Sequence, residues 1–428
     1  MTKNKIEENA IIDRLVSTIP GGGAHVHTKS YDSYPVTAPK ITSHGKGAYL
    51  FDQNGNKFLD YGMALRSVTI GYGEKSINEA AIKQINNGNT SSFPTLIELE
   101  AAERLVSLID SADMAKFIKD GSSATTAAVK LARAYTGRKI VARCKEQPFF
   151  SYDDWFIGTT SNNAGCLDET VNYTKLFEYN NIQSLEKIIS QYSNQVACVI
   201  LEPATYLMEP TNDFLSKVRL LCDKKNIVLI FDEIITGFRW SIKGAQHYYN
   251  VEPDLTAFGK GMANGFSLSA LVGKKELMDL GSIGVENRVF LLSSTHGAEM
   301  CSLGAFVATM DFYEKNDVVS HLKEYGSKLI HMMNEVSSYH ELADFFIVDG
   351  LPWLPRYTTN NLDGQRDSDL TMLFQQEMAR HKVLMRNIII CYRHGERELE
   401  LTRDALDKSL VVYKKALDNG VSRYLEKI

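Results

Sequence analysis

The 428-residue sequence is poor in cysteine, and its cysteines are not spaced as metal or disulfide clusters are. None of the six belongs to a C-x-x-C pair, so the sequence indicates neither a zinc site nor a disulfide framework. They lie at positions 144, 166, 198, 222, 301 and 391. This spacing favours free thiols in a reducing compartment.

Long apolar stretches are also absent. No stretch approaches the roughly 20 apolar residues that a membrane-spanning helix needs. Residues 1–9 are mostly polar or charged and no apolar segment follows them, which is not typical of a secretory signal peptide. We therefore expect a cytoplasmic protein without a membrane partner.

The sequence has no excess of basic residues. Its 47 Lys and Arg against 52 Asp and Glu give a net charge of −5, which indicates no nucleic-acid partner. The hydrophobic share of 44% and the charged share of 23% are those of a globular protein. The length predicts about two to three packed units.

The most informative stretch is the apolar run 227–231, which ends in Asp232 and Glu233. A short run bounded by polar residues predicts a buried strand of a parallel sheet, and an acid at its carboxyl end would lie on the ligand-binding edge. Acids after such a strand also occur in metal and nucleotide sites. No Gly-rich Lys-Ser/Thr loop supports that alternative, and no metal site is expected.

A second stretch places Lys260 between Gly259 and Gly261, in an apolar setting. Poor solvation lowers the pKa of a lysine and makes it a plausible Schiff-base amine. An acid facing a pyridinium nitrogen and a lysine that forms an imine are the two groups that pyridoxal phosphate chemistry most needs.

Together these stretches resemble the class III, or omega-type, aminotransferases, a family that includes glutamate-1-semialdehyde aminomutase. The resemblance is carried by residues 232–239, by Pro253-Asp254 and by Gly259-Lys260, with 260 − 232 = 28 positions between acid and lysine. Weaker matches extend it from about Pro20 to about Ala305.

The resemblance implies a fold-type-I α/β enzyme with pyridoxal 5′-phosphate as cofactor. It implies a large domain with a mostly parallel seven-stranded sheet and a smaller α+β domain built from both termini. We expect residues 1–60 to join the small domain, 61–315 to form the large domain and 316–428 to complete the small one.

A Gly-Ser turn opens a predicted helix at Gly121 and Ser122. By itself such a turn is more often an N-cap, but beside Lys260 and Asp232 it predicts a phosphate site at a helix N-terminus. It resembles the family motif Ser-Gly-(Ser/Thr)-Glu-Ala, with Asp120 and Ser123 in place of Ser and Glu. Because Asp120 would repel a phosphate, we expect it to contact another group.

The resemblance assigns further roles around the cofactor. Asp232 would bond the protonated ring nitrogen, and Lys260 would hold the aldehyde as an imine and then act as general base and acid. Phe149 and Ile234 would cover opposite faces of the ring. Glu202 would help to shape the site, with an ion pair to a nearby base as its alternative. For Phe149, a plain core aromatic is the alternative.

Three further residues are candidates for binding. In the family a threonine matching Thr295 reaches the cofactor phosphate of the other subunit, which implies a homodimer. His296, in a Thr-His-Gly pattern, is a candidate substrate contact. Arg66 is a candidate for a bidentate bond to a substrate carboxylate, and a surface arginine is its alternative.

The predicted function is transfer of an amino group from an amino acid, L-glutamate, to an aldehyde or ketone. The Thr-His-Gly pattern, Phe150 in place of a histidine and the altered loop after Glu202 resemble a subgroup that aminates keto-sugars such as an oxidised 3-deoxy-octulosonate. Two alternatives remain. One is an aminomutase of the glutamate-1-semialdehyde type, and the other is a non-catalytic binding protein on the same fold.

Local patterns predict several other elements. The Asn54-Gly55 dipeptide between alternating apolar residues predicts a hairpin over 47–60. Leu96, Leu99, Leu105 and Leu108 have helical spacing and predict a packing helix. The apolar run 387–392 predicts a strand of the C-terminal region.

Overall fold

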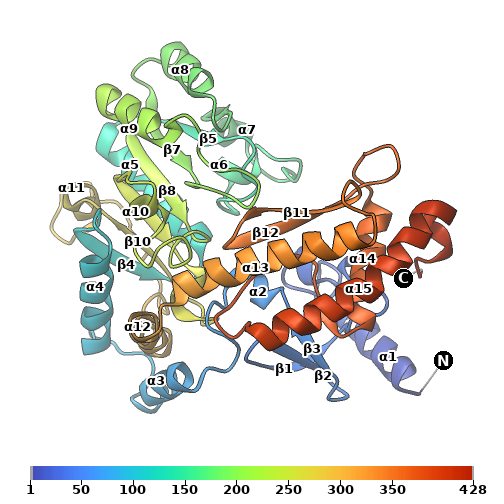
Figure 1. Cartoon of the computed structure of the whole chain (residues 1–428). Coiled ribbons are helices and arrows are strands. Elements are labelled where there is room, and N and C mark those ends of the chain that lie inside the picture. The colour runs from blue at the N-terminus through green and yellow to red at the C-terminus, as the bar shows by residue number, and fades with distance from the viewer. Residues whose placement is uncertain (1–2, 427–428) are drawn as a thin grey trace. The chain divides into compact units, whose positions relative to one another are not determined.

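The computed structural model describes residues 3–426, which divide into two compact units (Figure 1). The terminal unit comprises the described residues up to Leu65, Ile70–Glu74 and the described residues from Ser320 onward. The central unit comprises Arg66–Thr69 and Lys75–Val319.

The central unit is built on a seven-stranded sheet with the strand order β4-β10-β9-β8-β7-β5-β6. Strand β10 is antiparallel to both neighbours, and the remaining pairs are parallel. The strands are β4 (Met114–Ile118), β5 (Ile140–Cys144), β6 (Thr174–Phe177), β7 (Val196–Leu201), β8 (Val228–Glu233), β9 (Leu255–Phe258) and β10 (Ser269–Gly273). The expected fold-type-I sheet is confirmed.

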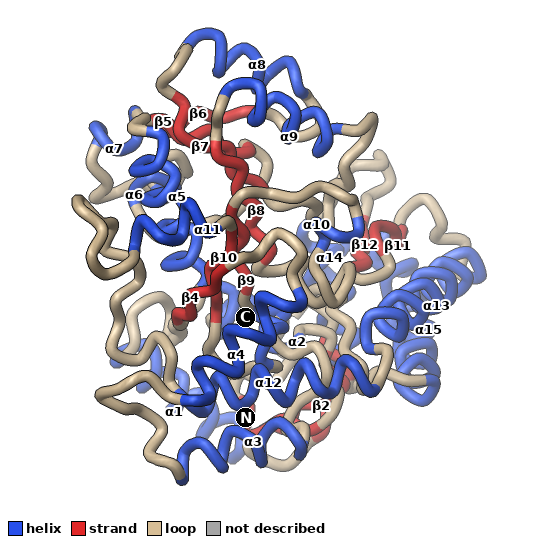
Figure 2. Tube along the Cα trace, turned by 90° about the vertical axis from the view of Figure 1, so that its left-hand side faces the viewer, coloured by secondary structure: helices blue, strands red, loops and turns tan. Residues whose placement is uncertain are grey.

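Helices lie on both sides of this row of strands (Figure 2). The longer ones are α3 (Lys75–Asn86), α4 (Leu96–Leu108), α5 (Gly121–Thr136), α8 (Ile182–Gln191), α9 (Phe214–Lys225) and α12 (Met300–Lys315). The short ones are α6 (Asp154–Ile157), α7 (Asp168–Asn172), α10 (Ala245–Tyr248), η3 (Lys260–Ala263), α11 (Lys275–Met278) and η4 (Asp279–Gly281).

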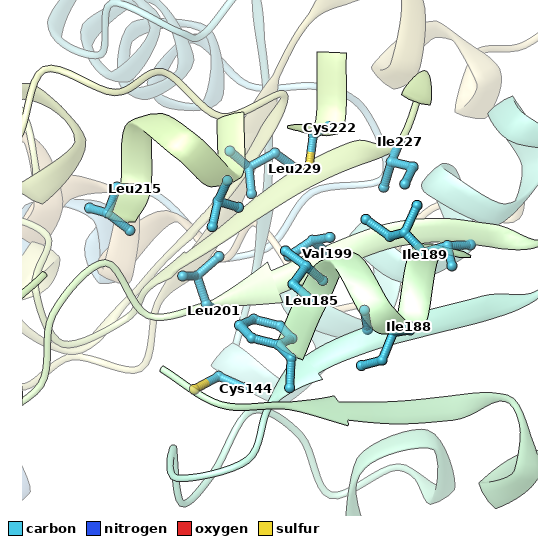
Figure 3. Close-up of a cluster of buried hydrophobic side chains, with 14 of the residues drawn as sticks. Cys144, Leu185, Ile188, Ile189, Val199, Leu201, Leu215, Cys222, Ile227 and Leu229 are labelled. Atoms are coloured by element: carbon cyan, nitrogen blue, oxygen red, sulfur yellow. The ribbon is translucent and has the colours of Figure 1, made fainter. Parts of the chain in front are cut away.

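Alternate residues of the central strands enter two apolar clusters, because successive side chains of a strand point to opposite faces. Leu229 of β8 belongs to the cluster that includes residues of α8 and α9, and Ile230 belongs to the cluster that includes residues of α5. Figure 3 shows the first cluster, with Cys222 of α9 beside Leu229. Each such side chain contributes roughly 1.5–3 kcal/mol on burial.

The predicted packing helix over 95–109 is confirmed as α4, but its expected apolar stripe is wrong at the start. Leu96 and Leu99 are 85% and 55% exposed. The buried face is formed by Ile97, Ala101 and Leu105 instead. The sequence contains two overlapping apolar stripes with the same helical period, and tertiary packing decides which of them is buried.

The terminal unit contains a four-stranded sheet of order β1-β2-β3-β13 and a separate hairpin. Its strands are β1 (Thr42–Lys46), β2 (Tyr49–Asp52), β3 (Lys57–Asp60), β11 (Phe346–Leu351), β12 (Leu354–Thr359) and β13 (Val383–Leu384). Its helical segments are α1 (Lys3–Thr18), η1 (His27–Lys29), η2 (Tyr31–Ser33), α14 (Ser368–Arg380), α15 (Glu396–Asn419) and η5 (Val421–Arg423). Two others begin or end at the boundary between units: α2 (Met63–Arg66) and α13 (Val318–Tyr339).

The predicted hairpin is confirmed as the antiparallel pair of β2 and β3. The strand predicted over 387–392 is wrong. Residues 388–391 are buried but extend no sheet, and the two residues Val383–Leu384 pair with β3 instead. An apolar run indicates that its residues are buried, but burial alone does not make them a strand of a hydrogen-bonded sheet.

None of the helices in residues 3–426 has the length and apolar character of a membrane span.

Candidate active site

A pocket of about 410 Å³ lies in the central unit, beside the carboxyl ends of β7, β8 and β9. Ligands of parallel α/β sheets bind at this edge. The pocket brings together seven residues that the sequence analysis had singled out. They are Gly121, Ser122, Phe149, Glu202, Asp232, Ile234 and Lys260.

Lys260 follows β9 and has a left-handed backbone with φ of 45°. Its glycine neighbours are required by close packing. A Cβ atom on Gly259 would lie 2.6 Å from Oγ of Ser269, and one on Gly261 would lie 2.7 Å from Cγ2 of Thr69. The positions on either side of Lys260 therefore have no room for a side chain, and only glycine fits there.

Burial lowers the pKa of Lys260 from its ordinary value. The carboxylates of Asp232 and Glu202 act in the opposite direction, and the guanidinium groups of Arg66 and Arg239 lower the pKa further. The amine is thus more readily deprotonated than a surface lysine, as a nucleophile or proton acceptor requires.

Asp232 is buried at the end of β8 and accepts one hydrogen bond, from the backbone N–H of Ile234 to Oδ1 at 3.0 Å. Burial raises the pKa of Asp232, and the neighbouring Lys260 lowers it. Burial also raises the pKa of Glu202, and the charge of Asp232 adds to this effect. Two carboxyl groups in so confined a space favour a cationic ligand beside them.

The adjacent Glu233 faces away from this chemistry. It is fully buried and accepts hydrogen bonds from the backbone N–H groups of Ala245 and Gln246 and from the side chains of Thr236 and Gln246. Its role in the structure is to fix the segment that follows β8.

Helix α5 begins at Gly121, and its first turn borders the pocket. Asp120 is the N-cap: Ser123 donates to it through its backbone N–H at 2.8 Å and through its hydroxyl at 2.9 Å. Asp120 thus contacts another group, as expected. A Cβ on Gly121 would lie 2.8 Å from Cδ1 of Ile234, so only glycine leaves this corner of the pocket open. The helix N-terminus favours an anion here.

The two aromatic residues after residue 148 both line the pocket but differ in exposure. Phe149 is 53% exposed, whereas Phe150 is buried and packs edge-on against Phe156 with ring centroids 5.5 Å apart. Thr125 of α5 donates a hydrogen bond to the carbonyl of Phe150 at 2.7 Å. This bond fixes the segment on α5 and leaves Phe149 with a free face.

Several pocket residues were missed by sequence reasoning, among them Tyr152, Lys119 and the segment 265–269. Tyr152 lines the pocket, and its hydroxyl lies 3.1 Å from Oγ of Ser123. Lys119 also lines it and forms an ion pair with Glu299 at 2.7 Å. Tyr152 and Lys119 lie within two residues of Phe150 and Asp120, but nothing local in the sequence tells which side chains near a motif face a ligand.

Arg66 does not line the Lys260 pocket, although its charge acts on Lys260 and Glu202. Its guanidinium lies over the ring of Tyr206, with 5.5 Å to the centroid. Its Nε is buried and has no hydrogen-bond partner within residues 3–426. A buried donor without a partner is costly, which indicates a ligand oxygen at this point.

Thr295 and His296 are not brought to the Lys260 pocket. Both are exposed, and Thr295 lines a separate pocket of about 400 Å³ together with Phe93 and Lys116.

Pyridoxal phosphate fits this set of residues. The buried acid and the lysine of lowered pKa stand in one pocket, and glycines keep open the space around Ile234. The pocket volume lies within the range of about 300–1,000 Å³ typical of small-ligand sites.

Comparison with known proteins agrees with this geometry. The family model "Aminotransferase class-III" matches residues 32–345. A 3-aminobutyryl-CoA aminotransferase of Cloacimonas acidaminovorans is 31% identical over 417 residues, covering 95% of this chain and 97% of the relative. A glutamate-1-semialdehyde 2,1-aminomutase of Francisella philomiragia is 30% identical over 350 residues, covering 79% and 80%.

Solved structures share the fold. An omega-transaminase from Sphaerobacter thermophilus has a TM-score of 0.85 and 24% identity, with 95% of this chain and 98% of that chain covered. A β-phenylalanine aminotransferase from Variovorax paradoxus has a TM-score of 0.83 and 19% identity, with 96% and 95% covered.

Proposed function

This chain belongs to the class III aminotransferases, pyridoxal phosphate-dependent enzymes, and we propose that it transfers the amino group of L-glutamate to an aldehyde or ketone acceptor. The observation that carries the proposal is the juxtaposition of Lys260 and Asp232 in one pocket with a helix N-terminus. Family membership also removes the hypothesis of a non-catalytic binding protein.

Each pocket residue has a role in this proposal. When bound, pyridoxal phosphate supplies an electron sink for bond breaking at the amino carbon. Asp232 would hold the ring nitrogen protonated, and Gly121 and Ser122 would hold the phosphate at the start of α5. Phe149 and Ile234 would exclude water from the ring.

Lys260 is the group that moves the proton. Its lowered pKa lets the amine accept a proton from the amino carbon of the donor, and the nearby carboxylates stabilise the ammonium that results. The same ammonium would then return the proton to the carbon on the other side of the amino nitrogen, and water would release the keto acid to complete the half-reaction.

Arg66 is the proposed site of a substrate carboxylate. Its buried Nε lacks a protein partner, and its planar guanidinium matches a carboxylate in two parallel hydrogen bonds. Glutamate carries carboxylates that can accept these hydrogen bonds. Substitution Arg66→Ala is expected to weaken binding of glutamate without loss of the bound cofactor.

A hydroxylated acceptor, such as a keto-sugar, is supported by a directed chain of hydrogen bonds. The hydroxyl of Ser123 donates to the carboxylate of Asp120 at 2.9 Å. Since Ser123 has a single hydroxyl proton, Tyr152 must donate in their contact of 3.1 Å. The Tyr152 oxygen is then left as an acceptor at the pocket wall, which favours a substrate hydroxyl.

We propose that the enzyme is a homodimer in which Thr295 completes the phosphate site of the partner. Thr295 stands apart from Lys260 within one chain, and its pocket is bordered by the 79% exposed ring of Phe93. Leu96, which is 85% exposed, follows three residues later. Apolar side chains exposed to this extent favour a protein partner.

An aminomutase is the second candidate, because a relative of that name is 30% identical over 350 residues. The two activities use the same cofactor residues. They differ in whether a keto acid leaves the enzyme.

The test is an absorbance spectrum of the cofactor-loaded protein before and after addition of L-glutamate, with assay of 2-oxoglutarate in the same sample. A spectral change with stoichiometric 2-oxoglutarate supports the glutamate-dependent reaction. An unchanged spectrum overturns glutamate as donor and favours the aminomutase or another donor. Lys260→Ala is the matched control and should give no 2-oxoglutarate.

A further inference from the structure

The turn that leads into Arg66 is left-handed and contains no glycine. Met63, Ala64, Leu65 and Arg66 have φ values of 38°, 45°, 57° and 77°. Residues other than glycine, asparagine and aspartate rarely adopt this conformation, and a run of four is far rarer than a single one. Backbone of this kind persists only where neighbouring groups enforce it.

Two side chains hold the turn. Oδ1 of Asp60 accepts the N–H of Gly62 at 2.8 Å, and Oδ2 accepts the N–H of Met63 at 2.9 Å. The hydroxyl of Tyr72 donates to Oδ2 of Asp60 at 2.7 Å and accepts the N–H of Ala64 at 2.8 Å. Three successive N–H groups are thus bound by one carboxylate and one phenol.

Both side chains are themselves fixed within the terminal unit. Asp60 is 4% exposed and ends β3. Tyr72 exchanges two backbone hydrogen bonds of 2.8 Å with Gly47. Its ring also packs against Gly45, where an added Cβ would lie 2.6 Å from the ring. The frame that holds the turn is therefore rigid.

The last residue of the turn is Arg66, whose buried Nε has no hydrogen-bond partner within the described residues. A change of its own φ to the ordinary negative range would redirect its side chain. Its carbonyl accepts a hydrogen bond from Nη2 of Arg239 at 3.1 Å. This bond fixes the backbone on the C-terminal side of Arg66 but not on its N-terminal side.

We propose that Asp60 and Tyr72 are positioning residues that set Arg66 for a substrate carboxylate by enforcing the left-handed turn before it. The inference rests on the proposed role of Arg66. It predicts that carboxylate binding depends on two residues that need not touch the carboxylate.

The test is Tyr72→Phe, which removes both bonds of the phenol and keeps the ring. Its readout is the affinity for glutarate, a dicarboxylate without an amino group, measured by calorimetry on the cofactor-loaded protein. Loss of one such hydrogen bond corresponds to about a tenfold weaker affinity. For the glutamate half-reaction we expect KM to rise by a similar factor with kcat nearly unchanged. Tyr339→Phe, at an 80% exposed tyrosine of the same unit, is the control and should bind like the wild type.

The decisive variant is Ala64→Gly added to Tyr72→Phe. Glycine adopts a φ of 45° without support, so the double variant should regain most of the lost affinity. If the role of Tyr72 is purely structural, Tyr72→Phe lowers thermal stability but leaves the glutarate affinity unchanged. Unchanged affinity overturns the inference. An affinity that falls and is not restored by Ala64→Gly also overturns it. If Tyr72→Phe does not fold, Asp60→Asn with and without Ala64→Gly makes the same comparison.

Failure of the proposed function is visible separately. If Arg66→Ala binds glutarate like the wild type, the inference is overturned together with the role of Arg66. If the wild type binds glutarate but yields no 2-oxoglutarate from glutamate, only the donor assignment fails.

Discussion

Two candidate cations of this enzyme stand on left-handed backbone, and they are held there in different ways. Lys260, with φ of 45°, is flanked by glycines that no larger residue could replace without a clash. Arg66, with φ of 77°, ends a turn of non-glycine residues bound by Asp60 and Tyr72. The first is confined by close packing at its two flanking glycines, and the second is held by hydrogen bonds from neighbouring residues.

The difference bears on what each site tolerates. Around Lys260 the backbone is confined by close packing of Gly259 and Gly261 against Ser269 and Thr69, so its geometry depends on those contacts. Around Arg66 the conformation is costly for each residue and depends on one carboxylate and one phenol. We therefore expect the lysine site to respond to changes in packing and the arginine site to respond to loss of hydrogen bonds.

The largest expected effect is that of Lys260→Ala. Removal of the amine should lower kcat by at least about 10²–10⁴-fold, because a proton carrier of this kind contributes that much. The measurement is release of 2-oxoglutarate from glutamate in single turnover. Lys217→Ala, at an exposed lysine that bonds the carbonyl of Asn212, is the control and should keep full activity.

The contrast also separates what sequence can predict from what it cannot. The apolar run before Asp232 and the glycines beside Lys260 are local signals, and they led to the strand, the sheet edge and the pocket. Seven residues chosen from the sequence line that pocket. Their chemical roles stay predictions, as does the subunit contact of Thr295.

Features set by distant contacts escaped prediction. The bonds of Tyr72 to Asp60 and Ala64 join residues 12 and 8 positions apart, and no composition signal marks them. The segment 387–392 was predicted as a strand because it is mostly apolar, although it does not pair with any strand of a sheet within residues 3–426. In both cases the deciding partner lies in another element of the fold.

Asp232→Asn tests the electrostatic half of the lysine site. Without the carboxylate, the ring nitrogen loses its partner and Lys260 loses a charge that raises its pKa. We expect a loss of about 10²–10³-fold in kcat, the size of other preorganised electrostatic interactions. The measurement is the same single-turnover assay, and near-normal activity would contradict the role of Asp232.

The stability of the cofactor-free protein gives Asp232 a second test. Burial raises the pKa of this carboxyl above the ordinary value of 3.8, so the folded state binds a proton more tightly than the unfolded state. The wild type should therefore lose stability relative to Asp232→Asn as the pH rises from about 4 toward neutrality. A constant difference across denaturant titrations at several pH values would contradict the raised pKa.

Gly259→Ala tests whether the glycines of the lysine site are required. The new methyl group would lie 2.6 Å from Oγ of Ser269 and 2.9 Å from Cδ1 of Ile234. Overpacking of this kind costs about 1–3 kcal/mol, measurable by denaturant titration, and should displace Lys260 enough to slow turnover. Addition of Ser269→Ala removes the nearest atom and should recover part of the loss.

The smallest expected effect is that of Ala64→Gly alone, and it has the opposite sign. Alanine is strained at a φ of 45° and glycine is not, whereas glycine gains more freedom on unfolding. The relief should exceed the entropy term and raise the free energy of unfolding by about 1 kcal/mol. Ala10→Gly in the right-handed helix α1 of the same unit should lower it by a similar amount. Loss of stability in both variants would mean that the turn near Arg66 is not strained, and the distinction between the two left-handed stretches would fall with it.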